Sequence, residues 1–468
     1  MPRRKGKVDI PGPRIPAIAQ GVAFYVRPVA FARALRRRYG PDFRIDLPPF
    51  GETAYLSDPD SIKAVFTGGD AFRAGEANWV LRPILGDHSV LLLDGDEHLA
   101  QRRMLLPPFH GDAVRAYADT VREITAENVA TWPRREPFGV RRHMQRITLE
   151  VIMRAVIGVS APDRLDTLRG LLKRLVAISD LDVIMFAVFP HFGDGKIARR
   201  FPPYSVRDQV HAFLDEEIDA RRARAEPGSD VLSLLVAARD DDGRALSNEE
   251  LRDEIITLLV AGHETTATAL GWAFERLSRN PRVLARLYEE IDAGESDDYV
   301  EAVCRETLRV RPVIQDVMRR VKEDVEVNGH RIERGAMAMP AIMLAHVDAA
   351  TYEDPDEFEP ERFLDAKPGT YTWLPFGGGT RRCIGAAFAL MEMKTVLKTA
   401  LQQVQLATTR SPGERPRIKH VTLVPHKGAR IAVENRRLAT STATVPPHGR
   451  PIRLARGDTR RQQPTRTR

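Results

Sequence analysis

The sequence predicts a mainly α-helical protein that carries small β-sheets near its two ends, and three observations support this fold class. Between about residues 110 and 280, apolar side chains recur at spacings of three and four, as in "ITLEVIMRAVIG", which is the period of a helix with one buried face. Residues 8–70 instead combine Pro and Gly turns with short apolar runs such as "TAYL". Near the other end, "VTLVPHKGARIAVE" is rich in side chains that favour strands.

The longest predicted helix starts after Ser247. Ser247 and Glu250 fit a capping box, and Asn280-Pro281 supplies the stop. A helix of about 32 residues is about 48 Å long, and its apolar middle, "IITLLVAG", indicates burial on all sides. The other expected elements are a helix in "SDDYVEAVCRETLRV", a hairpin around Asn328-Gly329, and a helix from Cys383 to about residue 405.

The composition predicts a globular protein with two basic tails. Its length alone would suggest two or three domains, although a single domain can be this large. Of the 468 residues, 43% are hydrophobic and 29% are charged, which is ordinary for a globular protein with a sizeable core. We expect a tail over residues 1–7, a single domain over 8–435, and a disordered tail over 436–468. Within the domain, a β-containing portion covers about residues 8–70, and the C-terminal strands cover about 420–434.

The formal net charge of +7 comes from the two ends of the chain. Residues 436–468 hold nine arginines and one acidic residue, Asp458, and residues 1–7 hold four basic side chains. The part between them is therefore slightly acidic. We expect the C-terminal tail to be a solvated segment, and we expect no nucleic acid as a partner.

Two features bear on the compartment. Two cysteines, Cys304 and Cys383, are too few for a disulfide framework or a four-cysteine zinc site. The charge-free stretch "IPAIAQGVAFYV" is too short to span a bilayer and is broken by Pro16, and no small-residue cleavage site follows it. We expect a monomeric cytoplasmic protein without a transmembrane anchor.

Cys383 stands in "FGGGTRRCIG", and four interpretations arise. The glycine spacing matches neither the dinucleotide nor the P-loop motif, and no histidine stands nearby to activate a catalytic thiol. A buried structural cysteine is the common alternative. A thiolate metal ligand is favoured, because a helix N-terminus at Cys383 and the adjacent Arg381 and Arg382 lower a thiol pKa. Glycines let a flat ligand approach the backbone, and arginine pairs with carboxylates. A thiolate, a flat partner and an anionic edge together describe haem.

This stretch resembles the haem-binding loop of the cytochrome P-450 family, Phe-Gly-x-Gly-x-Arg-x-Cys-x-Gly, at all six fixed positions. The six are Phe376, Gly377, Gly379, Arg381, Cys383 and Gly385. The resemblance spans about residues 35–433 and implies that haem lies between the long central helix and the cysteine loop. It further implies that Cys383 is the axial iron ligand, that Arg381 contacts a haem propionate, and that Phe376 shields the thiolate.

Two further matches concern the support of this loop and the oxygen site. "ETLR" supplies Glu306 and Arg309 and "PERF" supplies Arg362, which in the family form a buried ion cluster behind the haem loop. "AGHETT" matches the pattern over the haem. Its implied roles are cofactor contact for Ala261 and Gly262, with Gly262 leaving room for a diatomic ligand, proton supply for Glu264, and hydrogen bonding to dioxygen for Thr265. His263 is expected to point away from the haem.

Basic residues are the expected partners of the haem propionates. "DGDEHLAQRRMLLPPF" resembles the family's propionate-binding segment, with His98 and Arg102 on one helical face. Arg319 is a further candidate, although the neighbouring Arg320 leaves that assignment open.

The resemblance implies a haem b monooxygenase that inserts one atom of dioxygen into a substrate with NAD(P)H electrons. The chain has no flavin or nicotinamide domain, so a ferredoxin and its reductase are the expected donors, with Arg102, Arg103 and Arg382 as a docking patch. Two alternatives stay open: a peroxide-driven peroxygenase, and a haem-based ligand or gas binder without turnover.

The segments that the resemblance assigns to the substrate pocket are mostly aliphatic, which favours a lipophilic substrate. Gln315 and Asp316 can orient a polar group or face outward. The pocket segments are residues 75–93, "LDVIMFAVFP" at 181–190, 255–265, "VIQDVM" at 313–318, and the turn near Val424.

Overall fold

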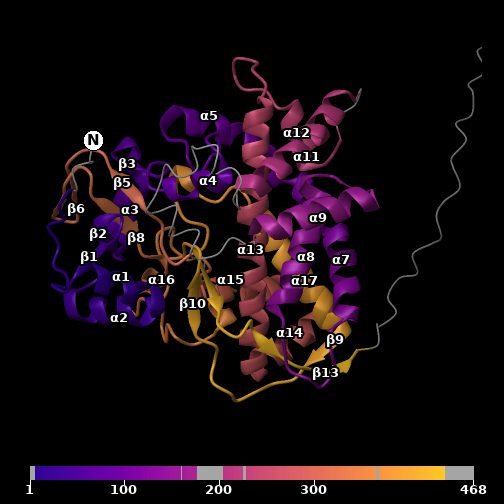
Figure 1. Cartoon of the computed structure of the whole chain (residues 1–468). Coiled ribbons are helices and arrows are strands. Elements are labelled where there is room, and N and C mark those ends of the chain that lie inside the picture. The colour runs from indigo at the N-terminus through magenta and orange to yellow at the C-terminus, as the bar shows by residue number, and fades with distance from the viewer. Residues whose placement is uncertain (1–5, 160, 177–203, 225–227, 365–367, 438–468) are drawn as a thin grey trace, which may run out of the picture. The chain divides into compact units, whose positions relative to one another are not determined.

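The computed structural model describes residues 6–159, 161–176, 204–224, 228–364 and 368–437 (Figure 1). The described residues up to Arg437 form one compact unit. The apolar stretch at 181–190 and the tail from residue 438 onward lie outside the described residues.

The largest sheet draws its strands from two distant parts of the chain, in the order β1-β2-β8-β5-β3. β2 pairs antiparallel with β1 and parallel with β8, and β5 pairs antiparallel with both β8 and β3. The β1–β2 hairpin alone would be marginally stable in water. Strands from the region after residue 318 complete the predicted N-terminal sheet. The strands are Asp42–Leu47 (β1), Gly51–Leu56 (β2), Phe72–Arg73 (β3), Arg319–Val321 (β5) and Met337–Pro340 (β8).

Smaller two-stranded sheets lie elsewhere in the described chain. The predicted hairpin is confirmed, since Val327 pairs with His330, and Asn328 and Gly329 make the turn with φ of 51° and 77°. The pairs are Val325–Val327 (β6) with His330–Ile332 (β7), Pro416–Lys419 (β10) with Thr422–Pro425 (β11), Phe138–Gly139 (β4) with Arg430–Ile431 (β12), and Val404–Leu406 (β9) with Val433–Arg436 (β13).

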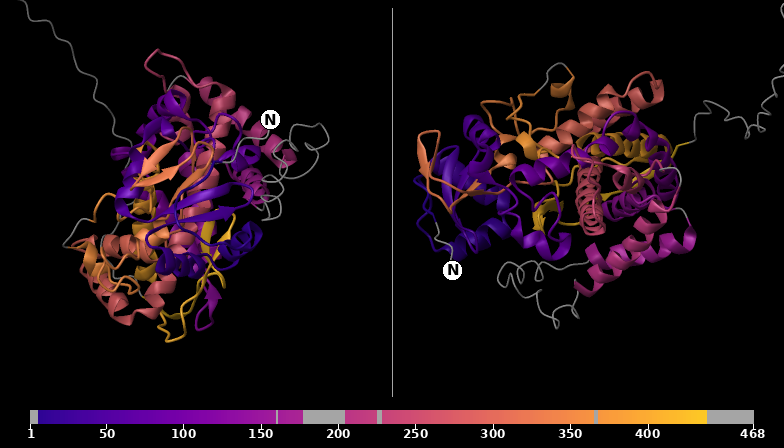
Figure 2. Two further views of the ribbon diagram at one scale, coloured as in Figure 1. Left: turned by 90° about the vertical axis from the view of Figure 1, so that its left-hand side faces the viewer. Right: turned by 90° about the horizontal axis from the view of Figure 1, so that it is seen from above.

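Helices make up most of the unit. Most helices after residue 110 lie on one side of the five-stranded sheet, whereas the three helices between residues 17 and 67 pack against the sheet itself (Figures 1 and 2). The helices are Ala17–Val26 (α1), Pro28–Tyr39 (α2), Pro59–Thr67 (α3), Arg82–Leu85 (α4), Gly95–Leu105 (α5), Asp112–Ala116 (α6), Ala118–Ala130 (α7), Arg141–Val151 (α8), Pro162–Val176 (α9), Tyr204–Arg222 (α11), Val231–Ala237 (α12), Asn248–Arg279 (α13), Pro281–Ala293 (α14), Asp298–Val310 (α15), Ile342–Ala345 (α16) and Ala386–Gln403 (α17).

The long central helix is α13, and its predicted bounds are confirmed. The Ser247 hydroxyl accepts from the Glu250 amide at 3.1 Å, and the Glu250 carboxylate accepts from the Ser247 amide at 2.8 Å, which closes the capping box. Asn280 ends the helix. α13 packs against α8, α15 and α17, so it organises the helical part of the molecule.

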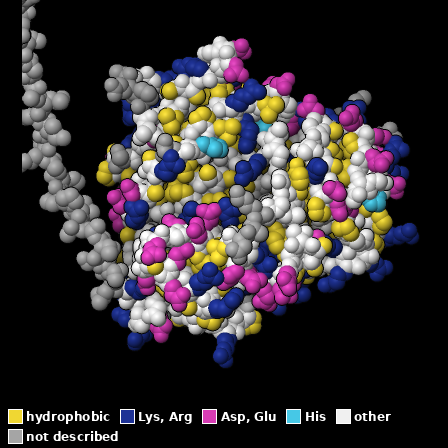
Figure 3. Space-filling view, turned by 180° about the vertical axis from the view of Figure 1, so that it is seen from behind, with side chains coloured by type: hydrophobic (Ala, Val, Ile, Leu, Met, Phe, Trp, Pro, Cys, Tyr) yellow, Lys and Arg dark blue, Asp and Glu magenta, His cyan; other side chains and the backbone are white. Residues whose placement is uncertain are grey.

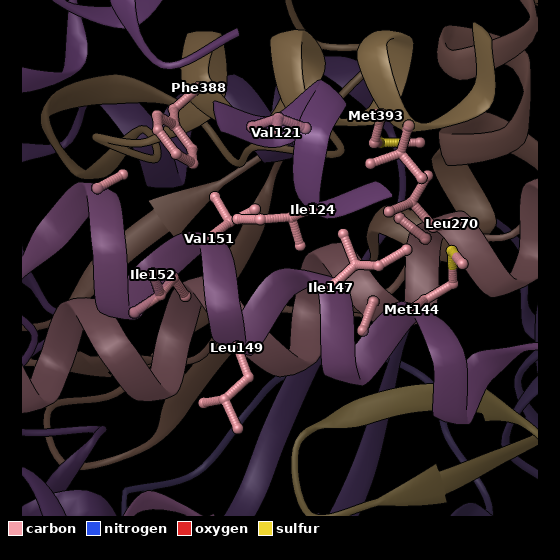
Figure 4. Packing of buried hydrophobic residues seen from close by; sticks show 14 of the residues in the cluster. Val121, Ile124, Met144, Ile147, Leu149, Val151, Ile152, Leu270, Phe388 and Met393 are labelled. Atoms are coloured by element: carbon pink, nitrogen blue, oxygen red, sulfur yellow. The ribbon is translucent and has the colours of Figure 1, made fainter. Parts of the chain in front are cut away.

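The helical core is aliphatic and closely packed. Figure 4 shows Val121 and Ile124 of α7, Ile147 of α8 and Leu270 of α13 within one buried cluster, together with Phe388 and Met393 of α17. This core holds α13 and α17 against each other, and the candidate site lies on α13 and on the loop that precedes α17.

Two boundaries differ from the sequence expectation. α17 begins at Ala386 and not at Cys383, because a 3₁₀ turn over Gly379–Arg381 precedes it. The ordered chain continues past residue 435, since Arg436 donates to the carbonyls of Val129 and Trp132, at 2.7 Å each. Arg436 therefore belongs to the folded unit.

The described surface is mixed in charge. Seen from behind, basic and acidic side chains are interspersed over the unit (Figure 3), in keeping with basic excess at the chain ends. Among the described helices, none is long and apolar enough to cross a membrane.

Candidate active site

The Cys383 loop is shaped by close contact with α3. Gly379 has a φ of 63°, and a Cβ on it would lie 2.3 Å from the Phe66 carbonyl oxygen, so only glycine fits there. The Cys383 amide donates to the Phe376 carbonyl at 2.9 Å. Phe376 lies edge-to-face with Trp373, with 6.1 Å between ring centroids. These contacts fix the backbone on both sides of the cysteine.

The Cys383 side chain is exposed, and a Cβ on nearby Gly385 would meet nothing within 4 Å. Although the side chain is accessible, protein atoms surround it closely, and the resulting desolvation raises the pKa of the Cys383 thiol; the Gly385 amide and the charges of Arg102 and Arg382 act to lower it. The net direction is therefore opposite to the sequence expectation, because desolvation by the surrounding protein outweighs these contributions.

One face of α13 is accessible although most of the helix is buried. Leu258, Ala261 and Thr265 are exposed or half-buried at spacings of three and four, which places them on one face of the helix. The Thr265 hydroxyl donates to the Ala261 carbonyl at 2.6 Å. The middle of α13 thus presents a hydroxyl and small side chains on an open face.

The opposite face of α13 binds α8. The Thr148 hydroxyl lies 2.8 Å from His263 Nδ1, so His263 is buried against α8, and burial lowers its pKa to about 4. Glu264 is ion-paired with Arg141 and accepts from Gln145 Nε2 at 2.8 Å. The Glu264 carboxylate, which is predicted to supply protons, is therefore bound by side chains of α8.

Gly262 lies close to the segment that continues α8. A Cβ at Gly262 would lie 3.1 Å from Ile152 Cδ1, which belongs to the segment that continues α8. The missing side chain lets α13 approach this segment closely, and the predicted room for a diatomic ligand at Gly262 stays a prediction.

Arg381 fastens the cysteine loop to the residues before α5. Its guanidinium donates to the Val90 carbonyl at 3.0 Å, to the Leu93 carbonyl, and to Asp94 Oδ1 at 2.6 Å. From α5 itself, Arg102 Nη2 donates to the Arg382 carbonyl at 2.6 Å. Two arginines therefore join α5 and its leading segment to the loop.

His98 and Arg319 complete a basic cluster with Arg102 and Arg381. His98 is buried, and burial followed by the charges of the three arginines lowers its pKa to about 3. Burial, then the charge of Arg381, lowers the pKa of Arg319 to about 10. Arg320 instead donates to the Gly335 carbonyl at 2.7 Å. The structure therefore places Arg319, and not Arg320, in the basic cluster.

The basic cluster carries more positive than negative charge. Its three guanidinium groups face one paired carboxylate, Asp94, and its histidine is neutral at pH 7 because its pKa is about 3. Buried charge without a counter-ion is costly. The cluster is therefore suited to a ligand that bears two carboxylates.

The predicted ion cluster behind the loop is present. Glu306 and Arg309 are fully buried and joined by two contacts of 2.7 Å. Arg362 Nε reaches Glu306 Oε1 at 3.3 Å. Arg309 also donates to the carbonyls of His346, Pro355 and Glu357, so it ties α15 to the chain that leads to the cysteine.

Several residues of the site carry no signal in the sequence. His346 accepts from the Leu374 amide at 2.7 Å, and burial lowers its pKa to about 3, so the neutral ring braces the cysteine loop. Asp94 and Arg141, the partners of Arg381 and Glu264, were also missed. Each stands more than 100 positions from its partner, and no local motif links them.

Residues 88–90, close before α5, are also tied to α13. Asp253 Oδ2 accepts from the His88 amide at 2.9 Å, and Glu254 Oε1 accepts from the Val90 amide at 2.6 Å. Gln101 bridges Glu254 and the His88 carbonyl. Segment 88–94 is therefore held by α13 on one side and by Arg381 on the other.

Residues 10–433 match the protein family described as Cytochrome P450, and the chain belongs to this family. It is 46% identical over 455 residues to cytochrome P450 135B1 of Mycobacterium tuberculosis, which covers 96% of each chain. It is 38% identical to cytochrome P450 138 of the same species, covering 91% of this chain and 96% of the relative. The solved structure of retinoic acid-bound cyanobacterial CYP120A1 matches with a TM-score of 0.76 at 24% identity, covering 92% of this chain and all of that one.

Family membership defines the class of reaction. The chain is a haem-dependent monooxygenase that uses haem b and dioxygen, with electrons that derive from NAD(P)H and arrive through redox partners. The predicted mainly helical fold with small sheets is likewise confirmed.

Proposed function

We propose that Cys383 is the axial iron ligand and that the enzyme inserts one atom of dioxygen into a lipophilic small molecule. The observation that carries this proposal is the basic cluster beside an exposed Cys383, with a surplus of charge that suits the two propionates of haem b. Thiolate-ligated haem supplies the iron chemistry that cleaves the O–O bond.

The basic cluster holds the cofactor edge in this proposal. Arg319 and Arg381 would donate guanidinium N–H groups to the propionates, and the neutral His98 would donate a ring N–H. Gly377 and Gly385, where a Cβ would meet nothing within 4 Å, leave the loop without side chains on its open face. Phe376 covers the backbone next to the thiolate.

Proton handling is assigned to two side chains of α13. The Thr265 hydroxyl donates to the Ala261 carbonyl in this structure and would donate a hydrogen bond to dioxygen once haem and dioxygen are bound. Glu264 is held by Arg141 and Gln145, so it must rotate away from α8 to pass a proton. Proton delivery is therefore gated by that ion pair.

The substrate site is assigned to the aliphatic face of α13 near Leu258 and to neighbouring segments. Asp316 is a poor candidate for substrate contact, because Tyr55 donates to it at 3.4 Å and burial raises its pKa to about 7. The Asp316 carboxyl group is therefore a hydrogen-bond partner of Tyr55 inside the protein. A lipophilic ligand is therefore bound chiefly by apolar contact.

The proposed electron donor is a ferredoxin with its reductase, and NAD(P)H supply together with two free cysteines favours the cytoplasm. Of the predicted docking patch, Arg382 is exposed, whereas Arg103 is paired with Asp241 at 3.1 Å. We expect the reduction rate to fall steeply with ionic strength; a rate independent of salt would contradict an electrostatic docking site.

The deciding experiment compares three assays of the purified holoenzyme. Lipophilic compounds are first screened for displacement of iron-bound water in the haem spectrum. Product from a spectral ligand with ferredoxin, reductase and NADPH supports a monooxygenase. Product with hydrogen peroxide alone indicates a peroxygenase, and binding without product in either assay indicates a haem-based binder.

A further inference from the structure

The exposed large apolar side chains of the described residues gather in two segments that touch. Ile18, Val26 and Val22 are the most exposed, at 75%, 63% and 57%. α1 contacts β10, and Val421 follows β10 in the turn to β11. The set, here called the α1 patch, comprises Ile15, Ile18, Val22, Tyr25, Val26 and Val421.

The α1 helix has apolar side chains on its outward side as well as on its inward side, unlike an ordinary surface helix. Its glutamine, Gln20, is buried and spans Ile15 and β1, donating to the Ile15 carbonyl at 2.8 Å and accepting from the Asp46 amide at 2.9 Å. Phe24 packs edge-to-face on buried Tyr55. A surface helix normally turns its apolar side inward, so this outward apolar face needs an apolar partner.

Positive charge borders the α1 patch. Arg14 and Arg27 flank α1, both are exposed, and the described residues give neither an acidic partner. An open groove of about 990 Å³ adjoins Ile15 and is lined by Arg14, Arg38 and Tyr39, with Asp9 also at its edge. Apolar side chains framed by arginines match the acyl boundary and phosphates of an anionic bilayer.

We propose that α1 lies flat in the surface of a membrane that contains anionic phospholipid. At 10 residues, α1 is about 15 Å long, which is too short to span a bilayer and sufficient to lie within its interface. The α1 patch enters the acyl boundary, and Arg14 and Arg27 contact lipid phosphates.

A second copy of the chain is a less suitable occupant of the α1 patch. A two-fold contact between antiparallel α1 helices would bring Arg14 of each copy close to Arg27 of the other. Like charges facing each other across an interface disfavour the pairing. Lipid phosphates, in contrast, neutralise the same arginines.

The test is flotation of the full-length holoenzyme with phosphatidylcholine vesicles, with and without phosphatidylglycerol. A phosphatidylglycerol fraction of about 30% gives the vesicles a negative surface potential that attracts basic side chains. We expect binding to the anionic vesicles. Ile18→Glu with Val22→Glu should lower the partition coefficient by at least about tenfold, because apolar burial is lost and repulsion is added. Gln402→Glu with Gln405→Glu, at exposed positions on α17 and β9, introduces the same charge and should bind as the parent.

Arg14→Gln and Arg27→Gln should each weaken partition to anionic vesicles by about fivefold and leave partition to neutral vesicles little changed. All variants must keep the parent's haem spectrum and melting temperature. The proposal is overturned if the parent does not float, or if the Ile18→Glu/Val22→Glu variant floats equally well. The proposal is also overturned, in favour of a second copy, if the parent sediments as a dimer without binding vesicles and the Ile18→Glu/Val22→Glu variant sediments as a monomer.

Discussion

The thiol of Cys383 sits in a protein environment that raises its pKa, so in our proposal the bound iron, and not the protein alone, makes it a thiolate. Cys383→Ser should abolish the red-shifted carbon monoxide band of the reduced enzyme, because serine cannot supply a sulfur ligand. The measurement is the reduced carbon monoxide spectrum at equal haem content. Cys304→Ala, at the other and buried cysteine, is the matched control and should keep the band.

Thr265 lies on the accessible face of α13, next to the Ala261 carbonyl. Thr265→Ala should keep NADPH consumption while product falls several-fold and hydrogen peroxide rises, because protons reach oxygen without control. The ratio of product to NADPH consumed measures this coupling. Thr266→Ser changes a buried neighbour and should stay coupled; equal coupling in Thr265→Ala would contradict the assigned role.

The motif residues could be predicted from the sequence because each stands in a short pattern of fixed spacing. Their partners could not. Glu264 is held by Arg141, and Arg381 is held by Asp94, and both pairs form only when distant segments pack. The direction of the pKa shift of Cys383 was predicted wrongly for the same reason, because desolvation depends on all the atoms that surround the thiol.

Among the elements, α15 carries the most consequential buried charge. Glu306→Gln removes a negative charge from a fully buried pair with Arg309, and breaking such a pair costs about 3–5 kcal/mol. We expect a clearly lower melting temperature and partial loss of haem during purification, both measurable by absorbance.

The same helix offers a control for that substitution. Glu301 pairs with Arg305 and Lys394 at 2.6 and 2.8 Å, but these side chains are about one-third exposed. Glu301→Gln should cost less than about 1 kcal/mol. If the two variants melt at the same temperature, the buried cluster does not have the supporting role assigned to it.

Element prediction succeeded where local signals are strong. α13 was predicted from its capping box and its Asn-Pro stop, both of which act within one turn. β5 and β8 have three and four residues, too few to show a period, and their place in the sheet depends on pairing with β2 and β3. The start of α17 was missed because the preceding 3₁₀ turn has no distinct signature.

For the whole molecule, buried ionisable groups predict a stability maximum in mildly acidic solution. Burial lowers the pKa of His346 to about 3 and of His143 to about 4. The unfolded chain binds these protons near pH 6.5, so their stabilising contribution is complete above that pH and is lost as pH falls towards 4.

Buried carboxyl groups act in the opposite direction. Burial raises the pKa of Glu254 and Glu392 to about 8, against about 4.3 in the unfolded chain, so stability falls as pH rises from about 4.5 to 8. Between about pH 4.5 and 6.5 the two sets of groups oppose each other, so the melting temperature measured from pH 4 to 9 should be highest in that range and should fall towards pH 8. Glu392→Gln should flatten the alkaline side and Glu136→Gln, at an exposed position, should not; an unchanged alkaline side in Glu392→Gln would contradict this account.

The double fastening of segment 88–94, by Asp253 and Glu254 on one side and by Arg381 on the other, constrains protein engineering. A chimaera that exchanges this stretch with that of a relative, in order to redirect substrate choice, retains its backbone path only if the recipient presents the same four anchoring side chains, Gln101 included. A graft of segment 88–94 should therefore also exchange positions 101, 253, 254 and 381, so that the segment keeps the side chains that hold it.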